Sequence, residues 1–420
     1  MTRPYMEMSW RVDHMQELSQ ILGQIADLAA TPLEAATSMP PDVYRSAALY
    51  ELERERLFAK EWLCPGLAAD IPDPGDYITY SINDQPVFIV RGEDGQIRSF
   101  ANVCLHRMMR LLDGRGNRRR IVCPYHAWTY EISGRLIGAP HMKRTPGFEP
   151  RRQCLPEIRT EVWDGWIYIT LNPEAPSVGA QLAPLLDVVG RYGTPGYVPI
   201  VTEDYAWNTN WKLLTENFME GYHLPVTHKR TVGAWFPADA TEFPSETFDG
   251  FTHQTFIKEQ TAKYGLAHRD NSRLEGRWRN TSVMPTVFPT HMYVLAPDHL
   301  WYLSLRPKAI GEVQIRFGAA LAPEVLAALE DPEAAKHELI TFFDQVNEED
   351  RGVVEGIYQG AKAPLSRPGR LSWLEREIHD FIGYLARRLT SSNVGAAQLY
   401  VQNSATDSGP PPHGNRSAAQ

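Results

Sequence analysis

The chain has 420 residues, and its composition, with 43% hydrophobic and 22% charged residues, is typical of a folded protein of about two domains. A formal net charge of −9 at pH 7 argues against nucleic acid as the main partner. The sequence lacks the run of about 18 apolar residues that a membrane helix needs, and its first residues lack the apolar core of a secretion signal. We therefore expect a cytoplasmic protein that does not bind membranes.

Residues 1–44 are predicted to form a helical segment that packs on the C-terminal domain. Apolar side chains recur at helical spacing between Trp10 and Leu28, and residues 48–62 have the pattern of a second amphipathic helix. Residues 45–170 alternate short β-branched and aromatic runs with turn residues, as in DYITYSI at 76–82. We expect an all-β domain there.

Residues 171–402 are predicted to form a second domain that mixes helices with longer strands. Three segments have helical patterns: 210–223, 332–360 and 373–389. Three others have the patterns of strands in one antiparallel sheet: 290–296, 300–306 and 312–321. Residues 403–420 show no apolar periodicity and are predicted to be disordered. The predicted fold class is α+β, with a β domain followed by a helix-grip-like domain in which helices cover an antiparallel sheet.

Two mixed cysteine and histidine pairs lie inside the predicted β domain, as Cys104-x-His106 and Cys123-x-x-His126. Two thiolates and two imidazoles on two β loops suit a Rieske [2Fe–2S] cluster, in which the thiolates bind one iron and the imidazoles the other. The alternatives are a structural zinc site and chance spacing. The arginines between the pairs are expected to be solvated, or else to contact a subunit or a redox partner.

A second pair of histidines suggests a mononuclear metal site in the C-terminal domain. His223 and His228 are five positions apart, so one straight helix would not aim both at one point. We expect the helix to end near His223 and Pro225 to turn the chain so that His228 comes back. Two histidines and one carboxylate form the facial arrangement of non-haem Fe(II) oxygenases.

The missing carboxylate can be sought by helical periodicity in the segment 342–360. Four residues form its predicted apolar stripe: Phe343, Val346, Val353 and Ile357. Asp350 completes this stripe, and a buried aspartate is costly unless it is paired or bound to a metal. We expect iron ligation, with a salt bridge to an arginine as the alternative. The neighbouring charged residues are expected to be solvated: Glu348, Glu349, Arg351 and Glu355.

Together these motifs resemble the large (α) subunit of Rieske non-haem iron oxygenases, over roughly residues 45–390. They are Cys-x-His and Cys-x-x-His, then Asn-x-x-Glu-x-Tyr-His-x4-His, then Glu-Asp-x4-Glu, in this order. The resemblance implies that the first set binds the cluster and that His223, His228 and Asp350 bind iron. The sequence departs from the family at Met108, where a small residue is usual; we expect this to affect the packing of the first loop and not its ligands.

The resemblance also implies a head-to-tail ring of three chains, with or without a small β subunit. In the family, the two metal centres of one chain are too far apart for fast electron transfer, and Glu220 would connect His223 to His106 or His126 of the neighbouring subunit. The alternative for Glu220 is an ordinary surface glutamate. Asn217 and Tyr222 match positions near the iron, with helix packing and capping as the alternative. A separate flavin and iron–sulfur reductase or a ferredoxin would deliver electrons from NAD(P)H.

The glutamate at 220 looks like the branch that oxidises quaternary ammonium compounds by hydroxylating an N-methyl or adjacent carbon. Five aromatic residues are candidates for a cation–π cage around the ammonium group: Trp235, Phe236, Tyr293, Trp301 and Tyr302. The same residues would serve an aromatic substrate, so a ring cis-dihydroxylating dioxygenase stays as the alternative function. A non-enzymatic, zinc-stabilised binding protein is the third.

Overall fold

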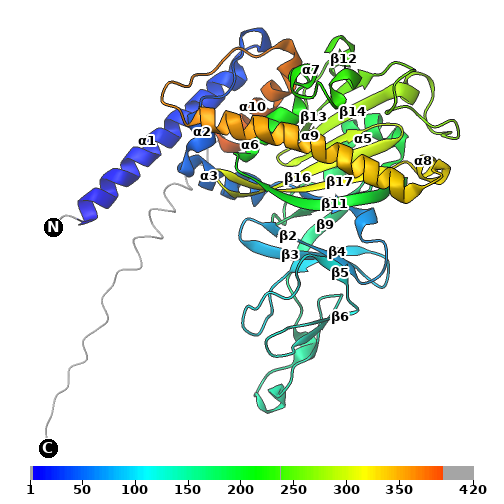
Figure 1. The fold of residues 1–420 in the computed structure, drawn as a ribbon. Coiled ribbons are helices and arrows are strands. Elements are labelled where there is room, and N and C mark those ends of the chain that lie inside the picture. Colours follow the sequence, from blue (N-terminus) through cyan, green and yellow to red (C-terminus); the bar gives the residue numbers. More distant parts are fainter. Residues whose placement is uncertain (1–2, 237, 391–420) are drawn as a thin grey trace, which may run out of the picture.

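The computed structural model describes residues 3–236 and 238–390, and within them three antiparallel sheets and a set of helices (Figure 1). The strands of the first sheet and of a small three-stranded sheet come from residues 63–170, whereas those of the second large sheet come from residues 198–321. The predicted α+β class is confirmed. The predicted disordered tail, 403–420, lies outside the described residues.

The first sheet and the small sheet build the domain in which the two Cys/His pairs lie. The first sheet has seven strands, in the spatial order β1 (Leu63–Leu67), β10 (Trp166–Thr170), β9 (Glu157–Trp163), β4 (Ile97–Ala101), β3 (Gln85–Arg91), β2 (Asp76–Ile82) and β5 (Arg115–Asn117). The small sheet consists of β6 (Arg120–Val122), β7 (Thr129–Glu131) and β8 (Leu136–Gly138). Strands β2 and β3 form a hairpin, as the alternating pattern at 76–82 predicts.

The second sheet is the framework of the C-terminal domain. Its seven strands follow the spatial order β11 (Val198–Trp207), β17 (Glu312–Leu321), β16 (His299–Ala309), β15 (His291–Leu295), β14 (Thr281–Val287), β13 (Phe251–Ile257) and β12 (Thr241–Glu242). The three strands predicted from the sequence are therefore adjacent members of one antiparallel sheet. They are long and largely buried because helices cover the sheet.

Helices pack on one face of this second sheet. The long helix α9 (Pro332–Ala361) crosses the sheet and α6 (Trp211–Met219) lies against it, whereas the single-turn α7 (Leu224–Thr227) packs on α9 (Figure 1). The N-terminal helix α1 (Arg3–Ala30) packs on α10 (Arg376–Leu389). The remaining helices are short: α2 (Asp42–Arg45), α3 (Ala47–Glu53), α4 (Val178–Gln181), α5 (Ala183–Val189) and α8 (Pro323–Ala328). No helix in the described part of the chain is long and apolar enough to span a membrane.

Two predicted helices end earlier than the sequence pattern indicates. The helix predicted to reach His223 ends at Met219, because the carboxylate of Glu220 accepts hydrogen bonds from the backbone N–H groups of Tyr222 and His223 and so holds an extended turn. The helix predicted over 48–62 is α-helical only to Glu53 and continues as one wider turn to Phe58.

The buried stripe of α9 also differs from the predicted one in its C-terminal half. Val346 is buried as expected, but Val354 and Tyr358 are buried in place of Val353 and Ile357, and Ile357 is 46% exposed. A helix advances 3.6 residues per turn, so a stripe counted in threes and fours can drift by one position. Asp350 keeps its place, four residues from both Val346 and Val354.

Candidate iron site and Rieske cluster site

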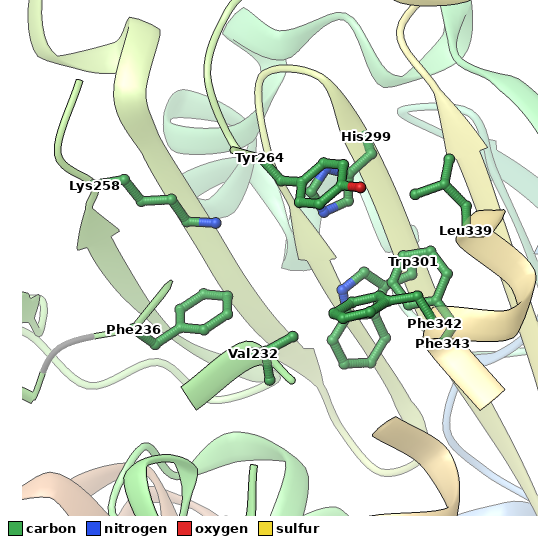
Figure 2. A pocket seen from close by; sticks show the side chains of 9 residues that line it. All are labelled: Val232, Phe236, Lys258, Tyr264, His299, Trp301, Leu339, Phe342 and Phe343. Carbon is green, nitrogen blue, oxygen red and sulfur yellow. The ribbon is translucent and has the colours of Figure 1, made fainter. Parts of the chain in front are cut away.

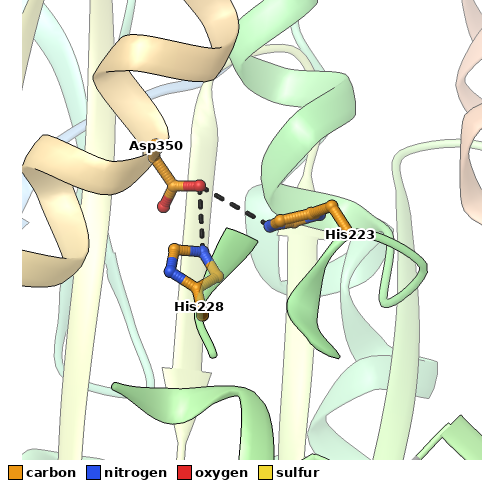
Figure 3. A group of neighbouring side chains, drawn as sticks. All are labelled: His223, His228 and Asp350. Atoms are coloured by element: carbon orange, nitrogen blue, oxygen red, sulfur yellow. Dashed lines mark hydrogen bonds and ion pairs between the residues drawn. The ribbon is translucent and has the colours of Figure 1, made fainter. Parts of the chain in front are cut away.

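Three side chains, from α9 and from the residues that flank α7, meet over the inner strands of the second sheet (Figure 3). Oδ1 of Asp350 lies 3.0 Å from Nε2 of His228 and 3.5 Å from Nε2 of His223. The three candidate ligand atoms all lie within 4.8 Å of one another, close enough to bind one ion. Among the described residues this is the one group of three such donors, and it is the trio expected from the sequence.

The chain between the histidines explains how a spacing of five brings both rings together. His223 precedes the single turn α7 and His228 follows it, with Pro225 in the first turn, where a proline fits a helix best. The loop then folds back, and the N–H of Gly233 donates to the carbonyl of His228 at 2.9 Å. A Cβ at position 233 would lie 2.5 Å from the Leu224 carbonyl oxygen, so this close approach requires glycine.

Each histidine is held on its other nitrogen by a carboxylate. Nδ1 of His223 hydrogen-bonds to Glu220, and Nδ1 of His228 lies 2.8 Å from Oε2 of Glu349. The hydroxyl of Thr231 donates to the same Glu349 oxygen at 2.6 Å. A carboxylate beside Nδ1 keeps the ring proton on that nitrogen. The other nitrogen, Nε2, then has a lone pair with which it can bind a metal.

The electrostatics of this group favour a cation. Burial disfavours a charged imidazole, yet the hydrogen bonds to Asp350 and Glu220 raise the pKa of His223 to about 10. Burial acts to raise the pKa of Asp350, but its hydrogen bonds to both histidines lower it overall. Three carboxylates around two imidazoles leave an excess of negative charge, which a divalent ion neutralises while it displaces the imidazole protons. The donor set fits mononuclear Fe(II).

Glu349 is a residue that the sequence reasoning missed. It was expected to be solvated, but its side chain is 24% exposed and is bound to His228 and Thr231. Glu355 is likewise partly buried, and it accepts a hydrogen bond from the backbone N–H of Asn208 at 3.0 Å. Both expectations are wrong because two separate loops, one with Thr231 and one with Asn208, pack against α9, and periodicity within the helix does not reveal such loops.

A small pocket opens directly onto the three ligands. Asn217 lines it, and its Nδ2 is 3.5 Å from Nε2 of His223. Tyr222, in contrast, is 59% exposed and does not line this pocket. The remaining wall is apolar, formed by Phe218, Leu224, Val232, Phe236, Met284, Val294, Trp301 and Val346. Such an apolar wall disfavours water beside the candidate ligands.

The five aromatic cage candidates separate into two groups. Trp301 and Phe236 line the pocket. Tyr293 and Tyr302 are fully buried in a different core cluster, and the Tyr302 hydroxyl donates to Asp70. Successive residues of a strand point to opposite faces, so Trp301 and Tyr302 cannot both face the pocket. The side chain of Trp235 lies outside the described residues.

The two Cys/His pairs lie on two loops with the same backbone hydrogen bonds. In the first loop the N–H of Cys104 donates to the carbonyl of Met109 at 2.8 Å, and the N–H of Met108 to that of Cys104 at 3.0 Å. In the second loop the N–H of Cys123 donates to the carbonyl of Trp128 at 2.8 Å, and the N–H of Ala127 to that of Cys123 at 3.0 Å. Met108 and Ala127 occupy equivalent positions, with φ of 56° and 55°.

The equivalent positions of Met108 and Ala127 in the two loops explain why a methionine can stand where the family usually has a small residue. A left-handed backbone favours glycine, which accounts for a small residue being usual there. Met108 nevertheless fits, because its side chain points outward and is 82% exposed. The loop backbone is therefore the same as that of the second loop, and the expectation that Met108 would disturb its packing is wrong.

The donors on these loops fit a two-iron cluster. Both cysteines are buried, whereas His126 is exposed and His106 half-buried, with their ring centroids 4.6 Å apart. Nδ1 of His106 is buried and has no hydrogen-bond partner among the described residues, as expected of a ligand atom. Within that part of the chain the four donors do not form a group able to hold a single ion, which argues against zinc.

Tyr130 is a second residue that the sequence reasoning missed. Its buried hydroxyl lies 3.3 Å from Sγ of Cys104 and accepts the N–H of Leu105 at 3.1 Å. A hydrogen bond to a ligating thiolate tunes the potential of a cluster. The arginines between the two pairs are exposed, as expected: Arg107, Arg110, Arg115, Arg118, Arg119 and Arg120.

Comparisons with known proteins agree with both sites. Residues 61–149 match the Rieske [2Fe-2S] domain, and residues 196–391 match the ring hydroxylating alpha subunit (catalytic domain). The glycine betaine monooxygenase oxygenase subunit of Pseudomonas aeruginosa is 26% identical over 399 residues, which cover 87% of this chain and 92% of that protein. The carnitine monooxygenase oxygenase subunit of Acinetobacter baumannii is 30% identical over 249 residues, 57% of this chain and 62% of that protein.

Solved structures show the same fold. The quaternary ammonium Rieske monooxygenase CntA in complex with L-carnitine superposes with a TM-score of 0.72 at 22% identity, covering 87% of this chain and 98% of that one. Naphthalene 1,2-dioxygenase from Rhodococcus sp. gives a TM-score of 0.73 at 20% identity, covering 90% and 98%.

These matches and the two metal-binding arrangements define an oxidoreductase. The chain belongs to the Rieske non-haem iron oxygenases, as an α subunit whose cofactors are a Rieske [2Fe–2S] cluster and a mononuclear iron. Within that family it lies near the monooxygenases of quaternary ammonium compounds, which favours a monooxygenase over a ring-dihydroxylating dioxygenase.

Proposed function

We propose that this α subunit is the oxygenase component of a monooxygenase that oxidises a quaternary ammonium or N-alkyl compound. The observation that carries the proposal is the pocket beside His223, His228 and Asp350, which Trp301 and Phe236 line together with the Asp350 carboxylate. Aromatic faces and nearby carboxylates both attract an ammonium group. The relatives named for glycine betaine and carnitine support the same substrate class.

The residue roles follow from the contacts. His223, His228 and Asp350 would hold the iron, and Cys104, His106, Cys123 and His126 would hold the cluster; these groups supply activation of O2 and storage of electrons. Glu220 and Glu349 keep the proton of each histidine on Nδ1. Asn217 offers an amide to a group bound beside His223. The apolar wall excludes water and directs a substrate carbon towards the ligands.

We also propose that three chains form a head-to-tail ring. Within one chain, the strands near the Cys/His loops and the turn α7 lie at opposite ends of the molecule (Figure 1). The exposed His126 and the loop of Glu220 are therefore suited to meet across a subunit boundary, where Glu220 would connect His223 to a cluster histidine of the neighbouring subunit. Residues 45–170 would carry the cluster and residues 171–402 the iron, with residues 1–44 packed on the latter.

Electrons would come from NAD(P)H through a separate reductase or ferredoxin that docks near the cluster loops. A cytoplasmic location fits the cysteines, because Cys64, Cys104, Cys123 and Cys154, all in the described part of the chain, form no disulfide.

A product screen tests the proposed function. Anaerobically reconstituted protein, with a compatible reductase, NADH and O2, is given quaternary ammonium compounds and, separately, aromatic hydrocarbons. We expect an aldehyde and a shorter amine from the first group and no diol from the second. Diol formation without aldehyde would instead support the dioxygenase. A colourless protein that contains only zinc after reconstitution would support the binding protein.

A further inference from the structure

A second hollow adjoins the iron pocket, and one of its ends is polar (Figure 2). The two cavities share Val232, Phe236 and Trp301. Figure 2 shows Val232 and Phe236 at one end of the hollow, and Tyr264 and His299 at the other. The hollow has room for about one water molecule, so it suits a water better than a part of the substrate.

Asp298 and His299 form a hydrogen-bonded pair at the turn between β15 and β16. Nδ1 of His299 lies 2.7 Å from Oδ1 of Asp298, and Oδ2 of Asp298 accepts the N–H of Gly265 at 2.8 Å. The N–H of Ala296 closes the turn by donating to the carbonyl of His299 at 2.8 Å. The carboxylate is therefore fixed in place, and it keeps one ring proton of His299 on Nδ1.

The second ring nitrogen of His299 is left for another partner. Within the described part of the chain, Nε2 of His299 makes no hydrogen bond. The ring of Phe343 packs against the imidazole, with the ring centroids 6.3 Å apart. The side chains of His299 and Asp298 are 11% and 14% exposed, so the pair reaches solvent as well as the hollow. An imidazole in this position can take up a proton from solvent and release it to a water inside.

The reaction of this family consumes protons in the iron pocket. Each O2 takes up two electrons and two protons, both when a monooxygenase forms an alcohol and water and when a dioxygenase forms a diol. The wall of the pocket is largely apolar. The Nδ1 protons of His223 and His228 are held by Glu220 and Glu349. Another donor must therefore supply the protons that the reaction consumes.

We infer that Asp298 and His299 deliver protons to the iron pocket through one water in the hollow. The N–H bond at Nε2 of His299 breaks, and its proton passes to the water, which releases another proton towards the oxygen that is reduced in the pocket. His299 then regains a proton from solvent, and Asp298 stabilises the ring while it is charged. Trp301 lines both cavities two positions along the same face of β16, about 7 Å away, a distance that one water can bridge.

A crystal structure of the holoenzyme tests the place of the water. We expect one ordered water in the hollow, within hydrogen-bond distance of Nε2 of His299. A dry hollow, or a water bound only to Lys258 and Tyr264, overturns the inference.

Turnover of His299→Ala tests the proton transfer, with a reductase, NADH, O2 and the compound that gives product in the screen above. We expect turnover to fall by about 100-fold or more, while the visible spectrum and the iron content stay unchanged. Added imidazole should restore turnover, whereas pyrazole, which has the same shape and is not protonated at neutral pH, should not. Equal rescue by the two compounds, or turnover equal to that of the wild-type protein, overturns the inference.

Asp298→Asn is a second variant that keeps the size of the side chain. Its amide can donate to Nδ1 of His299 and so reverse the tautomer, and we expect turnover to fall by about 10-fold or more. This variant decides the question if His299→Ala does not fold or is rescued by neither compound; wild-type turnover in Asp298→Asn then overturns the inference. Lys258 and Tyr264, the other titratable residues that line the hollow, are unchanged in both variants.

His268→Ala is the matched control. His268 forms a second pair with an aspartate, with its Nδ1 3.5 Å from Oδ2 of Asp270, and it lines neither cavity. Turnover of this variant should equal that of the wild-type protein, with and without imidazole. A loss as large as that of His299→Ala, restored by imidazole in the same way, would overturn the assignment to His299.

Discussion

His228 and Glu349 form a hydrogen bond, Nδ1 to Oε2 at 2.8 Å, on the side of the imidazole that faces away from Asp350. The two adjacent carboxylates of α9 therefore act on the two nitrogens of one ring. We expect Glu349→Gln to weaken Fe(II) binding by about 10- to 100-fold, because the ring loses the partner that fixes its tautomer. A competition titration of mononuclear iron measures this. Glu348→Gln is the control, since Glu348 is 75% exposed on the same helix; equal affinities in both variants would contradict the role of Glu349.

Asp350→Ala should remove the mononuclear iron and leave the cluster intact. In the proposed site the Asp350 carboxylate is the third ligand and offsets the charge of the cation, and its partners are His223 and His228. We expect an unchanged visible spectrum, loss of the mononuclear iron in metal analysis, and a loss of turnover of at least about 1,000-fold. Retained turnover would remove Asp350 from the site.

Glu220→Gln should separate electron transfer from metal binding. Glutamine keeps the size and a hydrogen-bond acceptor for His223, so both metals should stay bound, although the charge between the centres is lost. We expect reoxidation of the reduced cluster, in the presence of substrate and O2, to slow by about 10-fold or more. Single-turnover absorbance at the cluster band measures this rate. A rate equal to that of the wild-type protein would exclude the connecting role.

Met108→Gly should stabilise the first cluster loop. Met108 has φ of 56°, and a left-handed backbone costs a residue other than glycine about 1 kcal/mol. Its side chain is 82% exposed, so little packing is lost. We expect the cluster spectrum to persist to a higher denaturant concentration than in the wild-type protein. A shift to lower concentration would show that the Met108 side chain makes a stabilising contact.

The three candidate metal-binding residues could be found from the sequence because each leaves a mark within its own segment. Asp350 interrupts an apolar stripe, and Pro225 between two histidines indicates a turn. Glu349 leaves no such mark, because its importance depends on Thr231 and His228, which reach it from a loop more than a hundred residues away. The Glu-Asp dipeptide at 349–350 was the only sequence signal for a role of Glu349 at the metal site.

The substrate pocket was less predictable, for a related physical reason. The period of a strand shows that Trp301 and Tyr302 point to opposite faces, but it does not show which face lies under α9. Lys258 directly follows strand β13 and is only 3% exposed, although a lysine is usually at the surface, because the loop with Gly265 and the ring of Phe236 enclose it. Tertiary packing determines both features.

The alternation along β16 has a practical consequence for altering this enzyme. His299 and Trp301 line the cavities, whereas Leu300 and Tyr302 lie in the opposite core. Mutant libraries aimed at new substrates can therefore vary Trp301 while Leu300 and Tyr302 are kept; His299, to which proton delivery is assigned, and the core residues Leu303 and Leu305 further along the strand are kept as well. Here residues that line the cavities alternate with residues of the core. Directed evolution can therefore change the substrate selectivity of the enzyme with little cost to the stability of its fold.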